Sequence, residues 1–454
     1  MFIGRNEELN QIKRRLNISG FQAVLVYGKR RIGKTELINE AINSTKVRCL
    51  SLLAREVNLS INLEEFSEEA GAFMHNAAFY PKDFYQFYSS LFEYSKNNPF
   101  VLFIDEYSFL KKADNSIDSY LQKAIELHKN NCNITIILCG SYIEMMRGIV
   151  EKNAPLYHRF NEEILLHAFD YYDSAKFMNK ISLDDKFKYY AVFGGTAFNL
   201  KNINYNISFE ENVINELIKK DSFFEKEAIS TIKSEIEKEE NVNTIFELVA
   251  KGIRTYKEIN DIVGDPSKDN ISRYIKKLVD MDLIDKSYQV NSKSERKSLY
   301  YIKDNLLDFY YTFIFKYQRI RSFMPPKVFF DNYVKKELEE KYLPRKFEEI
   351  IKEFAVRNNS TKVPLFTSIG RLYYNDKNIN REFDVVMLVD GKYLPIECKY
   401  SKSLVGLEAL NEERYQWRDT PFEVIKYGFA SKSGFKEELK KEDVLLITLE
   451  DIYN

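Results

Sequence analysis

Continuous apolar runs alternate with amphipathic segments over the first third of the chain, and this pattern predicts a parallel α/β fold. Runs of strand length occupy four ranges, near 22–27, 47–53, 100–104 and 134–139. Apolar residues recur at helical spacing in five further ranges, near 6–16, 33–43, 61–75, 83–97 and 116–130. Strands buried on both faces are apolar throughout, because helices cover both sides of a parallel sheet. We therefore expect residues 1–168 to form one such domain.

The pattern divides the rest of the chain into four regions. Residues 169–240 have helical periodicity, interrupted at Gly194-Gly195, and predict a helical lid. Residues 241–303 mix short helices with two strands. Residues 304–344 are rich in aromatic side chains, which favours packing between domains. Residues 345–454 begin with an amphipathic helix and continue as strands, so a second α/β domain is expected there.

Three helices followed by two strands predict a winged helix over 241–303. The expected helices and strands cover Thr244–Ala250, Thr255–Val263, Lys268–Met281, Leu283–Val290 and Ser298–Ile302. Thr255 and Glu258 have the spacing of a capping box, which supports a helix start at this point.

Basic side chains gather on the third helix and the hairpin tip of this region. Residues 251–303 hold twelve Lys and Arg against eight Asp and Glu. The candidate DNA contacts are Lys268, Asn270, Arg273, Lys276, Lys277, Lys293, Arg296 and Lys297. A winged helix places such a helix in the major groove and the tip on phosphates. A solvated face on a protein-docking module explains the same pattern, so both partners stay open.

The overall composition sets broad limits. The 454 residues carry 67 Lys and Arg against 68 Asp and Glu, a formal net charge of −1, so any basic surface must be local. No apolar run approaches membrane-spanning length and no signal peptide follows Met1, so we expect a soluble, cytoplasmic protein without a membrane partner. The four cysteines and four histidines show no metal-ligand spacing, which argues against zinc.

Residues 28–35 are the most informative stretch for chemistry. An apolar strand ends at Gly28, a helix begins near Gly33, and the pattern between them is G-x-x-x-x-G-K-T. Glycines let such a loop turn its N–H groups inward, and the following helix directs its positive end at phosphates. Lys34 would reach the β/γ-phosphates of a nucleoside triphosphate, and Thr35 would hold Mg²⁺. The expected phosphate-binding residues are Gly28, Lys29, Arg30, Arg31, Ile32, Gly33, Lys34 and Thr35.

Two further strand ends complete this candidate site. The apolar run before Asp105 and Glu106 has the Walker B pattern, in which Asp105 holds the Mg²⁺ shell and Glu106 polarises the attacking water. The run at 134–139 ends in Gly140-Ser141, so Ser141 is placed to sense the γ-phosphate or the water. Gly-Ser is also ordinary turn chemistry after a strand, and that interpretation stays open for Ser141.

A hairpin near the C-terminus predicts a second chemical centre. Asp390-Gly391 is a favoured two-residue turn, and its register places Asp384 opposite Glu397, with Lys399 on the same face. Facing carboxylates repel unless a cation lies between them, and their oxygen atoms suit Mg²⁺ or Mn²⁺. Such a metal could activate water against a phosphodiester, with Lys399 steadying the developing charge. Glu348, on the preceding helix, could complete the metal shell.

A surface hairpin without a metal explains the same residues. By the same register Lys399 lies opposite Glu382, so these two could form an ion pair while Asp384 is solvated.

The N-terminal motifs resemble those of a known family. Phe2-Ile-Gly-Arg-Asn-Glu-Glu-Leu9, the loop at 28–35 with its Arg30-Arg31 pair, and Phe103-Ile-Asp-Glu106 are similar to the archaeal-type ATPases of the STAND-like branch of AAA+ P-loop proteins. Gly194-Gly195 resembles the family's G-G-x-P lid motif, with Ala197 where proline is usual. Arg159 falls in a segment that implies either an arginine finger between subunits of a homo-oligomer or a local ion pair.

The C-terminal region resembles a domain of unknown function that is often fused to these ATPases and is similar to PD-(D/E)xK nucleases. Glu348, Asp384, Glu397 and Lys399 fall on that pattern, although Phe383 rather than proline precedes Asp384. The resemblance implies an ATPase that acts on DNA and cleaves phosphodiesters with Mg²⁺. The alternative is an ATP-switched binding protein whose nuclease-like domain is not catalytic.

Overall fold

The computed structural model describes residues 2–233, 239–263, 270–290, 292, 298–376 and 379–454. The chain divides into two compact units, Met1–Ala168 and Phe169–Asn454, and each is described by itself. Within the described residues, no helix combines the length and the apolar character that crossing a membrane would require.

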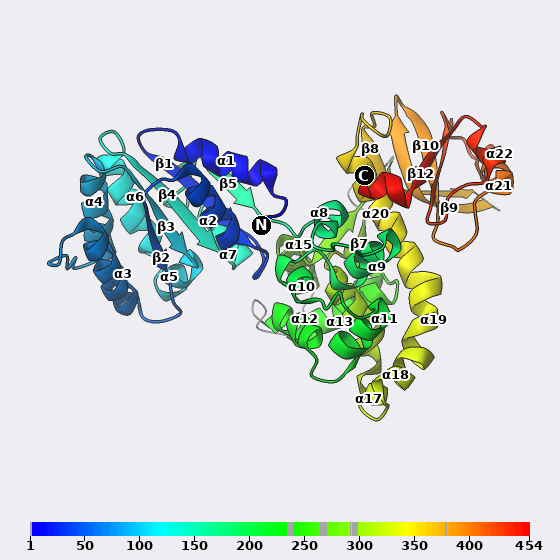
Figure 1. Cartoon of the computed structure of the whole chain (residues 1–454), viewed down its shortest axis with the longest axis horizontal. Helices are drawn as coiled ribbons and strands as arrows, with labels where there is room; N and C mark the ends of the chain where they lie inside the picture. Colours follow the sequence, from blue (N-terminus) through cyan, green and yellow to red (C-terminus); the bar gives the residue numbers. More distant parts are fainter. Residues whose placement is uncertain (1, 234–238, 264–269, 291, 293–297, 377–378) are drawn as a thin grey trace. The chain divides into compact units, whose positions relative to one another are not determined.

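Unit 1 is a parallel five-stranded sheet with helices on both faces (Figure 1). Its strands are β1 (Gln22–Tyr27), β2 (Cys49–Leu53), β3 (Phe100–Asp105), β4 (Ile134–Gly140) and β5 (Glu162–Leu165). Its helices are α1 (Asn6–Leu16), α2 (Lys34–Thr45), α3 (Leu59–Met74), α4 (Phe84–Ser95), α5 (Tyr107–Ala113), α6 (Ile117–His128) and α7 (Ile143–Gly148). The strand order is β2-β3-β4-β1-β5, and every pairing is parallel. The predicted α/β class is therefore confirmed.

Alternation along β1 divides the core of unit 1 into two layers. Val24 and Val26 face the cluster made with α1 and α2, whereas Leu25 and Tyr27 face the cluster made with α3, α4 and α6. All six residues of β1 are buried, as expected for a central strand covered on both faces. Sequence analysis did not predict β5, because its Glu162-Glu163 start lacks the apolar run that marked the other strands.

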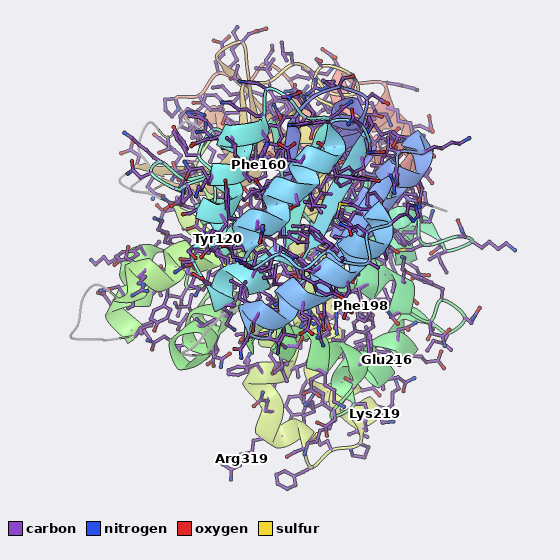
Figure 2. All side chains as sticks on the ribbon, turned by 90° about the vertical axis from the view of Figure 1, so that its left-hand side faces the viewer. Tyr120, Phe160, Phe198, Glu216, Lys219 and Arg319 are labelled. Carbon is purple, nitrogen blue, oxygen red and sulfur yellow. The ribbon has the colours of Figure 1, made fainter. Side chains whose placement is uncertain are left out.

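Unit 2 contains a helical region, a two-stranded sheet and a C-terminal mixed sheet. The helices before the mixed sheet are α8 (Tyr171–Ala175), α9 (Leu183–Phe193), α10 (Ala197–Asn202), α11 (Phe209–Val213), α12 (Phe223–Lys233), α13 (Glu239–Ala250), α14 (Tyr256–Val263), α15 (Asn270–Asp280), α16 (Asn305–Phe309), α17 (Gln318–Arg321), α18 (Pro326–Phe329), α19 (Lys335–Glu337) and α20 (Leu343–Arg357). Short π-helical turns lie at Ile214–Ile218, Tyr310–Ile314, Phe330–Val334 and Leu338–Tyr342, and a 3-10 turn lies at Phe315–Tyr317. Lys219 and Arg319 are exposed on the surface of this region (Figure 2).

The mixed sheet has the strand order β12-β11-β10-β9-β8. Its strands are β8 (Ser368–Asp376), β9 (Ile379–Val389), β10 (Lys392–Lys399), β11 (Tyr427–Ser431) and β12 (Val444–Thr448). Its helices after β10 are α21 (Leu407–Arg418), α22 (Glu437–Lys440) and α23 (Leu449–Tyr453). The β8, β9 and β10 strands pair antiparallel, whereas β10, β11 and β12 pair parallel. The segment before β8 forms a loop in which the Asn359 side chain exchanges hydrogen bonds with the Phe366 backbone, and the strand begins at Ser368.

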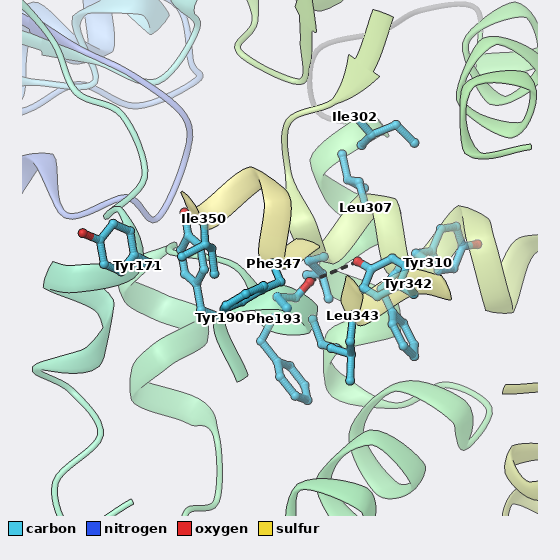
Figure 3. Packing of buried hydrophobic residues seen from close by; sticks show 14 of the residues in the cluster. Tyr171, Tyr190, Phe193, Ile302, Leu307, Tyr310, Tyr342, Leu343, Phe347 and Ile350 are labelled. Atoms are coloured by element: carbon cyan, nitrogen blue, oxygen red, sulfur yellow. Dashed lines mark hydrogen bonds between the residues drawn. The ribbon is translucent and has the colours of Figure 1, made fainter. Parts of the chain in front are cut away.

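The aromatic-rich segment at residues 304–344 packs against both the helical region and α20, in one buried cluster of unit 2. Figure 3 shows this core, where Tyr342, Phe347 and Phe193 belong to one buried cluster. The Tyr342 hydroxyl donates to the Ala191 carbonyl at 3.0 Å, which satisfies a polar group inside the apolar core.

The two-stranded sheet joins the mixed sheet at its β8 edge. It consists of β6 (Ile284–Ser287) and β7 (Leu299–Ile302). The predicted first strand, Leu283–Val290, is too long, because the chain leaves this pairing and Gln289 bridges Arg371 of β8 instead. The Val290 N–H donates to the Arg371 carbonyl at 2.9 Å. Backbone pairing therefore attaches this segment to the edge of the C-terminal sheet.

Candidate functional site

The phosphate-loop candidate begins with a close backbone approach at the end of β1. Gly28 has a φ of 157°, and a Cβ atom there would lie 2.3 Å from the Leu166 carbonyl oxygen. Gly33 has a φ of 101° and precedes the first residue of α2. Glycine is needed at Gly28 because there is no room for a side chain, and at Gly33 because of its left-handed backbone.

The Lys34 ammonium is buried in the turn of this loop. It donates to the carbonyl oxygens of Gly28 and Lys29, at 3.0 Å each, and to Ser141 Oγ at 2.9 Å. These three bonds use all three donors of the ammonium group. The loop backbone and the end of β4 therefore hold the cation at the start of α2.

Thr35 and Asp105 meet across the sheet end. Thr35 Oγ1 donates to Asp105 Oδ2 at 2.7 Å, and Asp105 is largely buried. A hydroxyl and a carboxylate at this separation are hard oxygen donors of the kind that Mg²⁺ prefers. The donor set therefore fits a magnesium ion at this position.

Glu106 and Ser141 form the third contact of the site. Ser141 Oγ lies 2.7 Å from Glu106 Oε1, and the Ser141 N–H donates to Glu106 Oε2 at 3.2 Å. Glu106 has a φ of 52°, an unusual conformation for glutamate that fixes its side chain at the end of β3. Because β4 lies between β1 and β3, Ser141 lies between Lys34 and Glu106.

The other predicted residues of the N-terminal site differ in exposure. Lys29 and Ile32 are buried, whereas Arg30 and Arg31 are exposed. Burial and the neighbouring Arg30 charge lower the pKa of Arg31. Arg159 forms a 2.9 Å ion pair with Glu126 of α6. This contact is the local ion pair that was considered beside an arginine finger.

The Gly194-Gly195 turn has a packing role inside unit 2. A Cβ atom on Gly195 would lie 1.8 Å from the Phe169 carbonyl oxygen, and the Phe169 N–H donates to the Gly195 carbonyl at 2.8 Å. Gly194 has a φ of 72°. The turn is therefore explained by a close approach of two backbone segments.

The C-terminal hairpin has the predicted register. Lys392 pairs with Val389, and the same register continues to the pair of Pro395 with Val386. Beyond these pairs the acidic side chains take separate partners. Glu397 Oε1 forms a 2.5 Å ion pair with Lys399, whereas Asp384 turns to β8.

Arg371 of β8 lies among the carboxylates where the sequence predicted a metal ion. Its guanidinium forms ion pairs with Glu348 of α20 at 3.2 Å, Glu382 at 2.8 Å and Asp384 at 3.1 Å. Over the described residues, no three His, Cys, Asp or Glu side chains are grouped so as to hold a metal ion. In this structure Arg371 pairs with Glu348 and Asp384, and Lys399 pairs with Glu397, so each carboxylate of the predicted metal shell has a cationic partner.

The structure does not form the alternative ion pair between Lys399 and Glu382, because each of these residues has another partner. Glu382 accepts from Arg371 and from the Tyr373 hydroxyl, each at 2.8 Å, while Lys399 pairs with Glu397. Sequence analysis missed Arg371, which pairs with Glu382 in place of Lys399. Its signal was an arginine within the alternating Ile369-Gly-Arg-Leu-Tyr373 run.

Burial and neighbouring charges shift the ionisation of this cluster. Burial, followed by the Asp384 charge, raises the pKa of Glu348 to about 8. Burial and the Arg371 charge lower the pKa of Lys352. Burial and the Glu397 charge raise the pKa of Glu413 to about 7. Glu348 and Lys352 of α20 therefore interact with Asp384 and Arg371 of the sheet, whereas Glu413 of α21 interacts with Glu397 and Lys399.

The candidate DNA-contact helix corresponds to α15. Its apolar residues Ile271, Ile275 and Leu278 are buried, while Arg273 and Lys276 are exposed and Lys277 is half-buried. The remaining predicted contacts lie outside the described residues or, for Asn270, have a side chain outside them: Lys268, Asn270, Lys293, Arg296 and Lys297.

Comparison with known proteins identifies two regions of the chain. Residues 2–203 match an ATPase domain predominantly from Archaea. Residues 310–414 match a family described as archaeal and bacterial proteins of unknown function.

Individual relatives cover different shares of the chain. An uncharacterized protein of Methanocaldococcus jannaschii is 28% identical over 461 residues, which cover 99% of this chain and 100% of that protein. An uncharacterized ATP-binding protein of the same organism is 36% identical over 52 residues, which cover 12% of this chain and 88% of that protein. The Walker-type ATPase of Pyrococcus abyssi has a similar fold, with a TM-score of 0.51 at 16% identity, over 68% of this chain and 96% of that structure.

Proposed function

We propose that this chain, whose residues 2–203 match an ATPase domain predominantly from Archaea, hydrolyses ATP to switch the DNA-binding state of unit 2. The observation that carries the ATPase half is the chain of contacts from Thr35 to Asp105 and from Lys34 through Ser141 to Glu106. The same set of side chains serves phosphate binding, metal binding and water activation in P-loop proteins.

Lys34 and Thr35 would bind the nucleotide and its metal. The Lys34 ammonium already lies against the loop carbonyls, so it can exchange one of these bonds for a phosphate oxygen. Thr35 and Asp105 would hold Mg²⁺, which neutralises phosphate charge when bound.

Glu106 would orient the attacking water, with Ser141 as its positioning residue. The Ser141 hydroxyl and N–H both reach the Glu106 carboxylate, which restrains it beside the phosphate loop. A carboxylate held in this way can accept a proton from water during attack on the γ-phosphate.

The DNA half of the proposal rests on α15 and the two strands that follow it. Helices α13, α14 and α15 followed by β6 and β7 have the order of a winged helix, and α15 exposes Arg273 and Lys276. Fluorescence anisotropy of labelled duplex and branched DNA, with ADP or a non-hydrolysable ATP analogue, tests this switch. We expect affinities that differ between the two nucleotides and fall with salt. Equal affinities, or no binding to either DNA, would contradict the DNA role while leaving ATP hydrolysis intact.

Phosphodiester cleavage by the C-terminal domain is the second candidate function. The observation that favours it is the position of Glu348 on α20 next to Asp384 on β9, with the Glu397–Lys399 pair on β10. The Arg371 ion pairs argue against it, because they occupy the carboxylates that a metal would need. Cleavage of supercoiled and branched DNA with Mg²⁺ or Mn²⁺, with and without ATP, tests this candidate. Loss of cutting in both Asp384→Ala and Glu397→Ala would establish it, and no cutting by wild type would exclude it.

A further inference from the structure

One guanidinium joins three carboxylates at the C-terminal charge cluster. Glu348 comes from α20, Arg371 from β8, and Glu382 and Asp384 from β9. The Arg371 side chain is 11% exposed and Glu348 is 18% exposed, whereas Asp384 is 41% exposed. Glu382 is 49% exposed, so the cation is less exposed than all three anions that surround it.

We infer that Arg371 is the resident cation of this cluster and takes the place of a divalent metal ion there. A guanidinium offers five N–H donors in a fixed plane, so one arginine can serve carboxylates from separate elements. A divalent ion instead needs several oxygens converging on one point at about 2.0–2.6 Å. Arg371 Nη2 contacts both Glu348 at 3.2 Å and Asp384 at 3.1 Å, whereas Nη1 contacts Glu382 at 2.8 Å. The guanidinium thus occupies the space between these carboxylates, and Glu397 is held by Lys399.

A second cation close to the cluster supports this inference. Lys352 follows Glu348 by one helical turn on α20, and its ammonium interacts electrostatically with Glu348, Asp384 and Arg371. The partly buried cations Arg371 and Lys352 therefore already balance the negative charges of Glu348 and Asp384. A divalent ion placed among them would meet like charges, which is unfavourable in a partly buried site.

Arg371 also connects the cluster to the two-stranded sheet. Its carbonyl accepts from the Val290 N–H at 2.9 Å, and its guanidinium lies 5.6 Å from the centre of the Tyr301 ring on β7. An arginine over an aromatic face is a stabilising cation–π contact. A metal ion could not make this contact with the Tyr301 ring. Arginine therefore explains both the carboxylate contacts and the ring contact.

Mn²⁺ binding by the full chain without nucleotide tests the inference, with free Mn²⁺ counted by electron paramagnetic resonance. We expect wild type, Asp384→Asn and Glu397→Gln to bind Mn²⁺ equally, because the carboxylates are held by Arg371 and Lys399. Any Mn²⁺ bound at the N-terminal site is common to all three proteins. Tenfold weaker binding in Asp384→Asn would overturn the inference, because a metal would then depend on that carboxylate.

Backbone hydrogen exchange tests whether the Arg371 contacts stabilise the strands around the cluster. Arg371→Gln keeps the backbone carbonyl but loses the ion pairs and the ring contact, so exchange in β7, β8 and β9 should become several-fold faster. Arg418→Gln is the matched control, because Arg418 is exposed, forms an ion pair with the adjacent Asp419 and lies 4.9 Å from the centre of the Tyr415 ring. If Arg371→Gln does not fold, Arg371→Lys retains one charge and should show an intermediate effect. Equal exchange in the Arg371 and Arg418 variants would contradict the inference.

Discussion

Thr35 Oγ1 lies 2.7 Å from Asp105 Oδ2, although β1 and β3, the strands that lead to these residues, are not neighbours in the sheet. Thr35 follows the loop after β1, Asp105 ends β3, and β4 lies between them. The strand ends converge at one edge of a parallel sheet, where ligands of α/β proteins usually bind. The site is thus assembled by strand order, and each of its residues can be tested separately.

Lys34→Ala should lower ATP turnover by about 100-fold or more, because the phosphate charge loses its principal cation. Phosphate release at saturating ATP measures the effect. Lys82→Ala is a suitable control, since Lys82 is exposed ahead of α4. Turnover in Lys34→Ala that matches the control would refute the phosphate-loop assignment.

Glu106→Gln should separate ATP binding from hydrolysis. The amide keeps an oxygen for the Ser141 hydroxyl but cannot take a proton from water, so turnover should fall about 10²–10³-fold while nucleotide affinity stays near wild type. Ser141→Ala should cost only about 2–10-fold, because it removes a positioning hydrogen bond. Filter binding of labelled ATP beside a turnover assay distinguishes these results. A larger loss in Ser141→Ala than in Glu106→Gln would reverse the proposed roles.

Most of the N-terminal fold could be predicted from the sequence, because the composition of most of its strands and helices already favours the structure that they form. The apolar runs that became β1, β3 and β4 are buried on both faces, so their composition identified them without tertiary context. The edge strand β5 is only partly apolar, and its place beside β1 depends on pairing that sequence periodicity does not report.

The C-terminal site was less predictable because its partners are distant in sequence. The hairpin turn at Asp390-Gly391 specified the local register correctly. Which cation faces Asp384 depended on β8, and Arg371 reaches it only through sheet pairing. Sequence analysis considered only charges within the hairpin and the preceding helix, so it did not include Arg371, which contacts Asp384 in the structure.

Glu353 should make stability depend on pH. Its carboxylate accepts from the Tyr190 hydroxyl at 3.1 Å, and burial together with the Asp170 charge raises the pKa of Glu353 from 4.5 to about 7. Between these values the unfolded chain releases the proton while the folded protein retains it, so stability falls as pH rises and does not recover above pH 7. The loss is at most about 3 kcal/mol.

Glu353→Gln tests this pH effect, because the amide oxygen can still accept from Tyr190 but cannot ionise. We expect the variant to melt at higher temperature than wild type at pH 8, with the difference shrinking as pH falls toward 5. Glu340→Gln, at an exposed position, should leave the pH profile unchanged. A difference between Glu353→Gln and wild type that is independent of pH would show that packing, not ionisation, explains the effect.

The buried ion pair of Arg321 and Glu225 should couple α17 to α12. Both side chains are 7% exposed, and Arg321 also donates to the carbonyl oxygens of Leu217 and Ile218 at 3.3 Å. Removing one partner leaves a charge buried without compensation, so Arg321→Met or Glu225→Leu alone should destabilise the protein by about 3–5 kcal/mol. Replacing both should recover part of this loss, because no charge then stays buried, although the two carbonyls lose their donor. Chemical denaturation of the four proteins gives the coupling energy, and additive losses in the double variant would show that the pair does not act as a unit.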